Sequence, residues 1–160
     1  MLCSFTPGCG SDVGRDGPSP ANPLDSVETT LVSELNGARG AAGLPALTIC
    51  RALNVSAAAH SDDMRDNGYL NDEGKDGSTP RDRACQAGYQ PACEGVLMAE
   101  LVASGSGDPV HTVGQWKGDA KSNTALLEPA LKVVGVGVSY GEEEPIWTAD
   151  LGGEDDSSCP

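Results

Sequence analysis

The sequence predicts an α+β fold in which helices come first and a β-hairpin comes last. Apolar residues recur at helical spacing through much of the first 130 residues. Apolar residues instead alternate with other residues in the two segments 134–140 and 146–151, which a short Gly-Glu-Pro turn separates. Strands are the minority and do not alternate regularly with helices, so a doubly wound parallel sheet is not expected.

The first helix is expected to begin at Asn22-Pro23, because Asn caps helices and Pro is tolerated at the first helical position. Its apolar face is formed by Val27, Leu31, Leu35 and Ala38. Gly40, Gly43 and Pro45 are expected to end it. Residues 1–21 are rich in Gly, Pro, Ser and Asp, so the segment 1–23, up to this start signal, is predicted to be a disordered leader or linker.

The middle of the chain predicts further helices and one short strand. A second helix is expected over 51–66, and its apolar stripe consists of Leu53, Ala57, His60 and Met64. A short helix over 80–87, a strand over 93–98 and a helix from Pro109 follow, with Val110, Val113 and Trp116 facing inward. A shorter helical piece is expected to end at Leu126 and Leu127. We expect His60, Trp116 and Trp147 to be buried in the core and His111 to lie on the surface.

The charge balance excludes several classes of partner. Ten basic residues against twenty-four acidic residues give a formal net charge of -14. Nucleic acid binding and adsorption to anionic lipid both require basic patches, so neither is expected. No run of about 18 apolar residues is present, so no transmembrane segment is predicted. The acidic balance favours a soluble monomer.

Six cysteines indicate an oxidising compartment, and they are Cys3, Cys9, Cys50, Cys85, Cys93 and Cys159. None has the spacing of a zinc knuckle, so disulfides are expected. Two interpretations of Cys9 stay open: the lipid-modified residue of a bacterial lipoprotein, or a disulfide partner of Cys3. No signal peptide precedes Cys9, so an extracellular or cell-envelope location is inferred from the cysteines alone.

Several segments, in order along the chain, resemble bacterial domains of the CAP superfamily, also called SCP domains. The segments are LNGARGAAGLPALTICRALNVSAAAHSDDM, NGYLNDEGKDGSTPRDRACQAGY, QWKGDAKSNTALLEPALKVVGVGVSY and IWTADLGG. The resemblance covers residues 24–153, which we therefore expect to form one CAP domain, followed by an acidic tail over 154–160. It implies a three-layer α-β-α sandwich with a cleft on one side. Two disulfides are expected, Cys85 with Cys93 across a short loop and Cys50 with Cys159.

The resemblance also places the family's cleft residues. Many family members hold a divalent metal between two histidines, with glutamates beside them. The histidine positions fall at Asp72 and Ser122, and the glutamate of the Gly-Glu-Asn motif is assigned to Glu94. Loss of both imidazoles removes most affinity for a transition metal, so no metal or other cofactor is expected. The loop 72–77 does not fit a calcium loop, because Gly74 and Arg83 stand where oxygen ligands are required.

Two functional hypotheses follow. The first is a non-catalytic exported or envelope-attached module that binds an unknown protein or small ligand through the altered cleft. Its basis is the loss of both histidines without a replacement nucleophile and base, since no Gly-x-Ser-x-Gly motif is present. The alternative is an enzyme or regulated protein that uses zinc or calcium held by Asp72 and Glu94.

Overall fold

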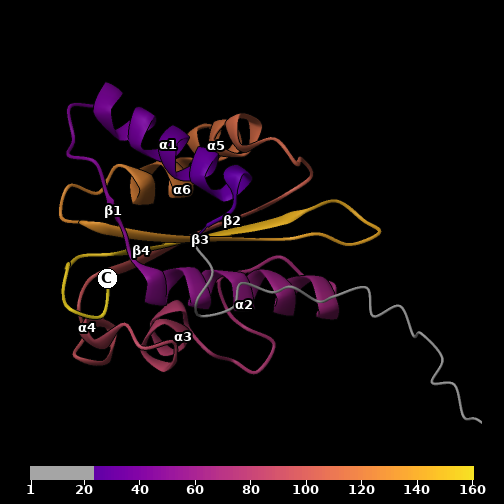
Figure 1. Ribbon diagram of the computed structural model, residues 1–160. Helices are drawn as coiled ribbons and strands as arrows, with labels where there is room; N and C mark the ends of the chain where they lie inside the picture. The colour runs from indigo at the N-terminus through magenta and orange to yellow at the C-terminus, as the bar shows by residue number, and fades with distance from the viewer. Residues whose placement is uncertain (1–23) are drawn as a thin grey trace, which may run out of the picture.

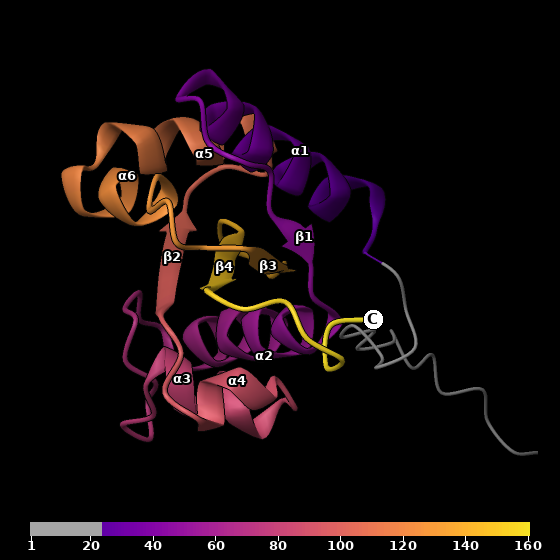
Figure 2. The same cartoon turned by 90° about the vertical axis from the view of Figure 1, so that its left-hand side faces the viewer.

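The computed structural model describes residues 24–160, which form a sheet between two layers of helices (Figures 1 and 2). The elements are α1 (Ser26–Ala41), β1 (Thr48–Ile49), α2 (Arg51–Asn67), α3 (Pro80–Gln86), α4 (Gln90–Cys93), β2 (Met98–Ser104), α5 (Pro109–Gly118), α6 (Ala120–Leu126), β3 (Val133–Ser139) and β4 (Ile146–Gly152). The expected α+β sandwich is therefore confirmed. The predicted leader over 1–23, including Cys3 and Cys9, lies outside the described residues.

The sheet has four strands in the order β1-β3-β4-β2. β1 is parallel to β3, whereas β4 is antiparallel to both of its neighbours. Figure 2 shows α1, α5 and α6 on one face of the sheet and α2, α3 and α4 on the other. No helix in residues 24–160 is long and apolar enough to cross a membrane.

Two predicted element boundaries were wrong. The first helix begins at Ser26, because the Asp25 carboxylate accepts hydrogen bonds from the backbone N–H of Val27 and Glu28, both at 2.8 Å. The Glu28 carboxylate in turn accepts a hydrogen bond from the Asp25 backbone N–H, which completes a capping box. The expected strand over 93–98 is instead the end of α4 and a turn, and β2 begins only at Met98. The sequence reasoning missed α4 and the two-residue strand β1.

The layer of α1, α5 and α6 covers the larger apolar core. Trp116 and Trp147 are buried there as expected, and their indole N–H groups donate to the carbonyl oxygens of Val102 and Ser106. Both aromatic side chains thus satisfy their one polar group inside the core. Val110 was predicted to face inward but is 55% exposed, because the apolar face of α5 runs through Val113 and Trp116.

On the other face, α2 packs very closely against β3. A Cβ atom added at Gly135 would overlap the backbone of Leu53, and one added at Gly137 would overlap the backbone of Ala58. The glycines of the Val-Gly-Val-Gly strand are therefore required by this approach rather than by a turn. The approach also places His60, on α2, against the sheet, in which Glu100 of β2 and Asp150 of β4 are buried.

Both predicted disulfides are present in the structure. Cys85 bonds to Cys93 across a short loop, and Cys50 at the start of α2 bonds to Cys159, 109 residues away. The segment 154–160 is held further by the Tyr89 hydroxyl, which donates to the Glu154 carbonyl oxygen at 2.6 Å. The bonded Cys159 is 7% exposed, so this acidic segment is fixed against the body of the domain.

Candidate functional site

Asp72 and Lys121 form an ion pair that joins the loop after α2 to α6. The Lys121 ammonium donates to the Asp72 carboxylate at 2.5 Å. The hydrogen bond and the charge of Asp72 raise the pKa of Lys121. The structure thus brings the predicted site residue Asp72 to the helix that carries the second one, Ser122. The Lys121 ammonium therefore offsets part of the negative charge of Asp72, in a pair whose lysine side chain is 81% exposed.

Ser122 lies in the first turn of α6. Its backbone N–H donates to the carboxylate of Asp119, the residue that caps this helix, at 2.8 Å. The bond lowers the pKa of Asp119, since it stabilises the ionised form. Ser122 is half-buried, and the cap fixes the backbone from which its hydroxyl projects. A hydroxyl is a much poorer ligand for a transition metal than an imidazole.

Glu94, the third predicted cleft residue, is placed differently. It is exposed and ends α4, in the helix layer opposite to that of α6. Within residues 24–160, no hydrogen bond or ion pair joins its side chain to Asp72 or Ser122. The structure therefore brings two of the three predicted positions to neighbouring elements and leaves Glu94 at a separate one.

A buried polar cluster that the sequence reasoning missed lies between α2, α3 and the sheet. Glu100 on β2 and Asp150 on β4 are directly paired in the antiparallel register, and both are buried. The Glu100 carboxylate accepts from Arg83 of α3 at 2.7 Å. Acidic residues inside two otherwise apolar strands were the sequence signal for this cluster.

The two carboxyl groups of the cluster hold protons more tightly than exposed carboxyls do. Burial, followed by the facing charge of Asp150, raises the pKa of Glu100 to about 10. Burial raises the pKa of Asp150 as well, and no hydrogen bond of ordinary geometry reaches either of its oxygens within the described chain. Arg83 opposes both shifts. The pair therefore keeps a proton at neutral pH, while the guanidinium balances the remaining negative charge.

His60 and Arg83 connect this cluster to the loop that carries Asp72. The Arg83 Nη2 group that donates to Glu100 also donates to the Asp72 carbonyl oxygen, at 2.8 Å. His60 Nε2 lies 2.8 Å from the Asn71 carbonyl oxygen and 3.4 Å from a Glu100 oxygen. Burial and then the charge of Arg83 lower the pKa of His60, so its imidazole is neutral at pH 7. The cluster therefore fixes the position of the Asp72 loop.

His60 is the core histidine that the sequence predicted, although its bonding is incomplete. The side chain is fully buried, and the Asn71 carbonyl is the partner of Nε2. Its Nδ1 atom has no hydrogen-bond partner among residues 24–160. His111 is exposed on α5, as expected. Among residues 24–160, no hydrogen bond joins either histidine to a serine, threonine or cysteine side chain, so no hydrolytic set is assembled from them.

Fold and sequence comparisons define the class of protein. The family described as the cysteine-rich secretory protein family, CAP, matches residues 32–151. The chain belongs to this family, and it is a member of the bacterial type. The uncharacterized protein YkwD of Bacillus subtilis strain 168 is 29% identical over 136 residues, which is 85% of this chain. The chain spans about half, 51%, of the length of that relative.

Solved structures share the fold at low sequence identity. An outer surface protein of Borrelia burgdorferi matches with a TM-score of 0.71 and 20% identity, over 82% of this chain and 97% of that protein. An extracellular protein with an SCP domain from Bacillus anthracis matches with a TM-score of 0.65 and 22% identity. That match covers 84% of this chain and 45% of the Bacillus anthracis chain. These likenesses support the fold.

Proposed function

We propose that this CAP domain is an exported or envelope-attached binding module whose altered cleft takes a protein or small ligand without a metal ion. The Asp72–Lys121 ion pair carries the proposal. A divalent cation would have to displace the ammonium from Asp72, and the neighbouring position offers only the hydroxyl of Ser122. Within residues 24–160, no group of three or more His, Cys, Asp or Glu side chains is placed to hold a metal.

The buried cluster around Glu100 supports a structural role for its polar residues. Glu100, Asp150 and His60 are buried, and Arg83 connects Glu100 to the backbone of the Asp72 loop. A general base must reach a substrate proton directly or through one water molecule. Glu100 and Asp150 are only 9% and 0% exposed, so these two carboxyl groups support a fixed loop rather than proton transfer to a ligand.

The proposed location has two supports. Two disulfides in one domain are typical of proteins that fold in an oxidising compartment. In addition, one structural relative is described as an outer surface protein and another as extracellular. A lipid anchor at Cys9 remains part of the proposal, and mass measurement of the protein recovered from its native membrane fraction tests it.

Calorimetric titration of the metal-free protein with zinc and then calcium tests the absence of a metal centre. We expect no saturable heat for the wild-type protein. Lys121→Met removes the ammonium and keeps a side chain of similar length, so it should leave Asp72 open to weak cation binding. Lys117→Met, an exposed lysine on α5, is the matched control. Stoichiometric metal binding by the wild type that Glu94→Ala or Asp72→Asn abolishes would overturn the proposal in favour of a metal-dependent protein.

A further inference from the structure

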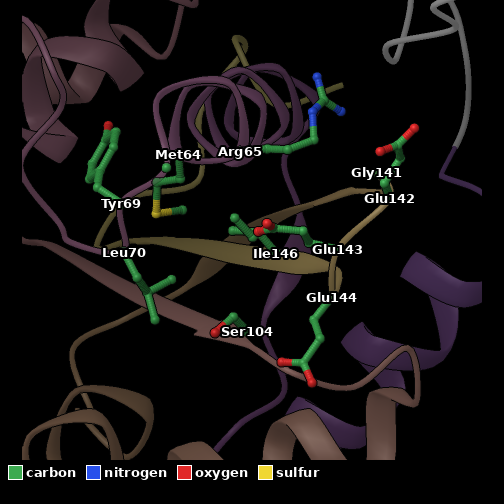
Figure 3. Close-up of a pocket in the computed structure, with 11 residues that line it drawn as sticks. Met64, Arg65, Tyr69, Leu70, Ser104, Gly141, Glu142, Glu143, Glu144 and Ile146 are labelled. Atoms are coloured by element: carbon green, nitrogen blue, oxygen red, sulfur yellow. The ribbon is translucent and has the colours of Figure 1, made fainter.

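A large groove lies at the end of the molecule opposite to the disulfide-bonded C-terminal segment, between the last turn of α2 and the β3–β4 hairpin. Its volume is about 940 Å³, at the upper end of the range for ligand pockets. Figure 3 shows its lining side chains, which come from α2, the residues after it, β2 and the hairpin. The groove contains none of Asp72, Glu94 or Ser122.

The floor of the groove is apolar. Met64, Tyr69, Leu70 and Ile146 line it, and Leu70 is 47% exposed there. Figure 3 places Met64, Tyr69 and Leu70 together on one side and Ile146 across from them. This concave apolar floor, with the half-exposed Leu70 in it, provides hydrophobic contact area for an apolar side chain of a ligand.

The rim of the groove is acidic. Glu142, Glu143 and Glu144 are consecutive and exposed at the hairpin turn. No hydrogen bond or ion pair engages their carboxylates within the part of the chain that the structure describes. The Glu144 carboxylate lies above Gly105, where its oxygen would be 3.2 Å from an added Cβ atom. Three unpaired carboxylates on one turn create a strongly negative local potential.

Arg65, the one cation among the described residues that line the groove, does not offset this charge. Its guanidinium is bound by Asp62 at 3.0 Å and by Asp66 at 2.9 Å. It also donates to the Ser139 hydroxyl and the Tyr140 carbonyl oxygen. Arg65 is thus turned toward its own helix and strand, and Figure 3 shows its guanidinium pointing away from the apolar floor.

We propose that this groove binds a cationic peptide segment of a partner protein, with an apolar side chain on the floor and a lysine or arginine at the Glu142–Glu144 rim. Charge complementarity selects this occupant. A fatty acid or an anionic lipid would present its negative group to three carboxylates, and nucleic acid phosphates would be repelled in the same way. The proposal concerns a surface separate from the cleft, so it does not depend on the proposed function.

Fluorescence anisotropy with short peptides tests this assignment. The probe is a fluorescein-labelled pentapeptide of alternating lysine and leucine, and the matched peptides alternate lysine with serine or glutamate with leucine. We expect binding of the lysine–leucine peptide to the full chain, weakened by salt because the charges are exposed. The other two peptides should bind at least about tenfold more weakly, since each lacks one half of the complementarity.

Three variants distinguish binding in the groove from general attraction of the peptide to the negatively charged protein. Glu142→Gln/Glu143→Gln/Glu144→Gln should weaken binding about tenfold, and Leu70→Ser several-fold. Glu73→Gln/Glu154→Gln/Asp155→Asn removes the same charge from residues elsewhere on the surface and should change binding less than twofold. None of these positions is buried, so circular dichroism should show unchanged folding.

Three results would overturn the proposal: no binding up to about millimolar peptide, equal binding of the glutamate–leucine peptide, or equal losses of binding in both triple variants. Binding that appears only after removal of residues 1–23 would also overturn it, by assigning the groove to this chain's own segment.

Discussion

Glu100 and Asp150 lie directly opposite each other on neighbouring antiparallel strands, and both face the buried side of the sheet beneath α2. Two carboxyl groups paired across strands and removed from water cannot both be ionised without a large free-energy penalty. Arg83, donating to Glu100 at 2.7 Å, supplies one positive charge. The arrangement therefore requires one retained proton, and this makes stability depend on pH.

The free energy of unfolding should fall as the pH rises from neutral to alkaline. In the unfolded chain Glu100 ionises near its ordinary pKa of 4.5, whereas in the folded protein burial raises its pKa to about 10. The contribution of Glu100 to the free energy of unfolding is fully present below the unfolded-state pKa, and it is lost as the pH rises toward the folded-state pKa. We expect Glu100→Gln, which keeps the size and a hydrogen-bonding oxygen, to reduce the loss between about pH 7 and 9 by about 2 kcal/mol.

Urea unfolding at several pH values measures this effect. Asp150→Asn should flatten the profile in the same way, because the proton belongs to the pair. Glu73→Gln, at a position that is not buried, should leave the profile unchanged. An unaltered slope in both Glu100→Gln and Asp150→Asn would show that the carboxyl pair holds no proton at neutral pH.

The close approach of α2 to β3 predicts a strong difference between glycines. Gly137→Ala should lower the free energy of unfolding by about 3 kcal/mol, because the added methyl group overlaps the backbone of Ala57 and Ala58. Gly114→Ala on α5 should instead stabilise the protein by about 0.5–1 kcal/mol, since nothing lies within 4 Å of the added atom. Denaturant unfolding of the two variants measures both. Equal tolerance of both substitutions would mean that α2 does not rest on β3 as described.

The two disulfides should contribute unequally. In the chain-entropy model, the bond between Cys50 and Cys159 closes a far longer loop than the bond between Cys85 and Cys93, with sequence separations of 109 and 8. Removing the first with Cys50→Ala/Cys159→Ala should therefore cost about 4–5 kcal/mol, and removing the second with Cys85→Ala/Cys93→Ala about 2–3 kcal/mol. Thermal and urea unfolding of the paired variants give the comparison. The opposite order would show that local strain or packing, rather than loop closure, sets the contribution.

Much of this fold was predictable because its signals are local. The β3–β4 hairpin was found from alternating valines, and α2 from the stripe that runs from Leu53 to Met64. The start of α1 was misplaced because Asn22-Pro23 is a plausible start signal, while the real cap requires Asp25 and Glu28 to bond each other. Such reciprocal bonding is visible in a sequence only as one pattern among several.

The interior of the site was not predictable for a different reason. A charged residue in a strand ordinarily lies on the solvent-facing side, and Glu100 falls outside the strand that the sequence predicted over 93–98. The burial of Glu100 depends on Arg83, which lies 17 residues away in the sequence and bonds to it only in the folded chain. The Asp72–Lys121 pair has the same character, since its two residues are 49 positions apart. Partners distant in the sequence decide both features.

Zinc binding by Asp72→His/Ser122→His tests most directly whether these two positions are the altered metal site of a CAP cleft. We predict that the correctly folded variant binds one zinc ion in the micromolar range or better, about 8 kcal/mol, in a calorimetric titration. In the histidine variant Lys121 loses its partner Asp72, and its ammonium could repel zinc, so a second histidine variant also carries Lys121→Ala. Asp72→Ala/Ser122→Ala is the control. Saturable zinc binding by either histidine variant, with none in the control, is the result that the proposed cleft predicts. Folded histidine variants that take up no zinc would contradict the placement of Asp72 and Ser122.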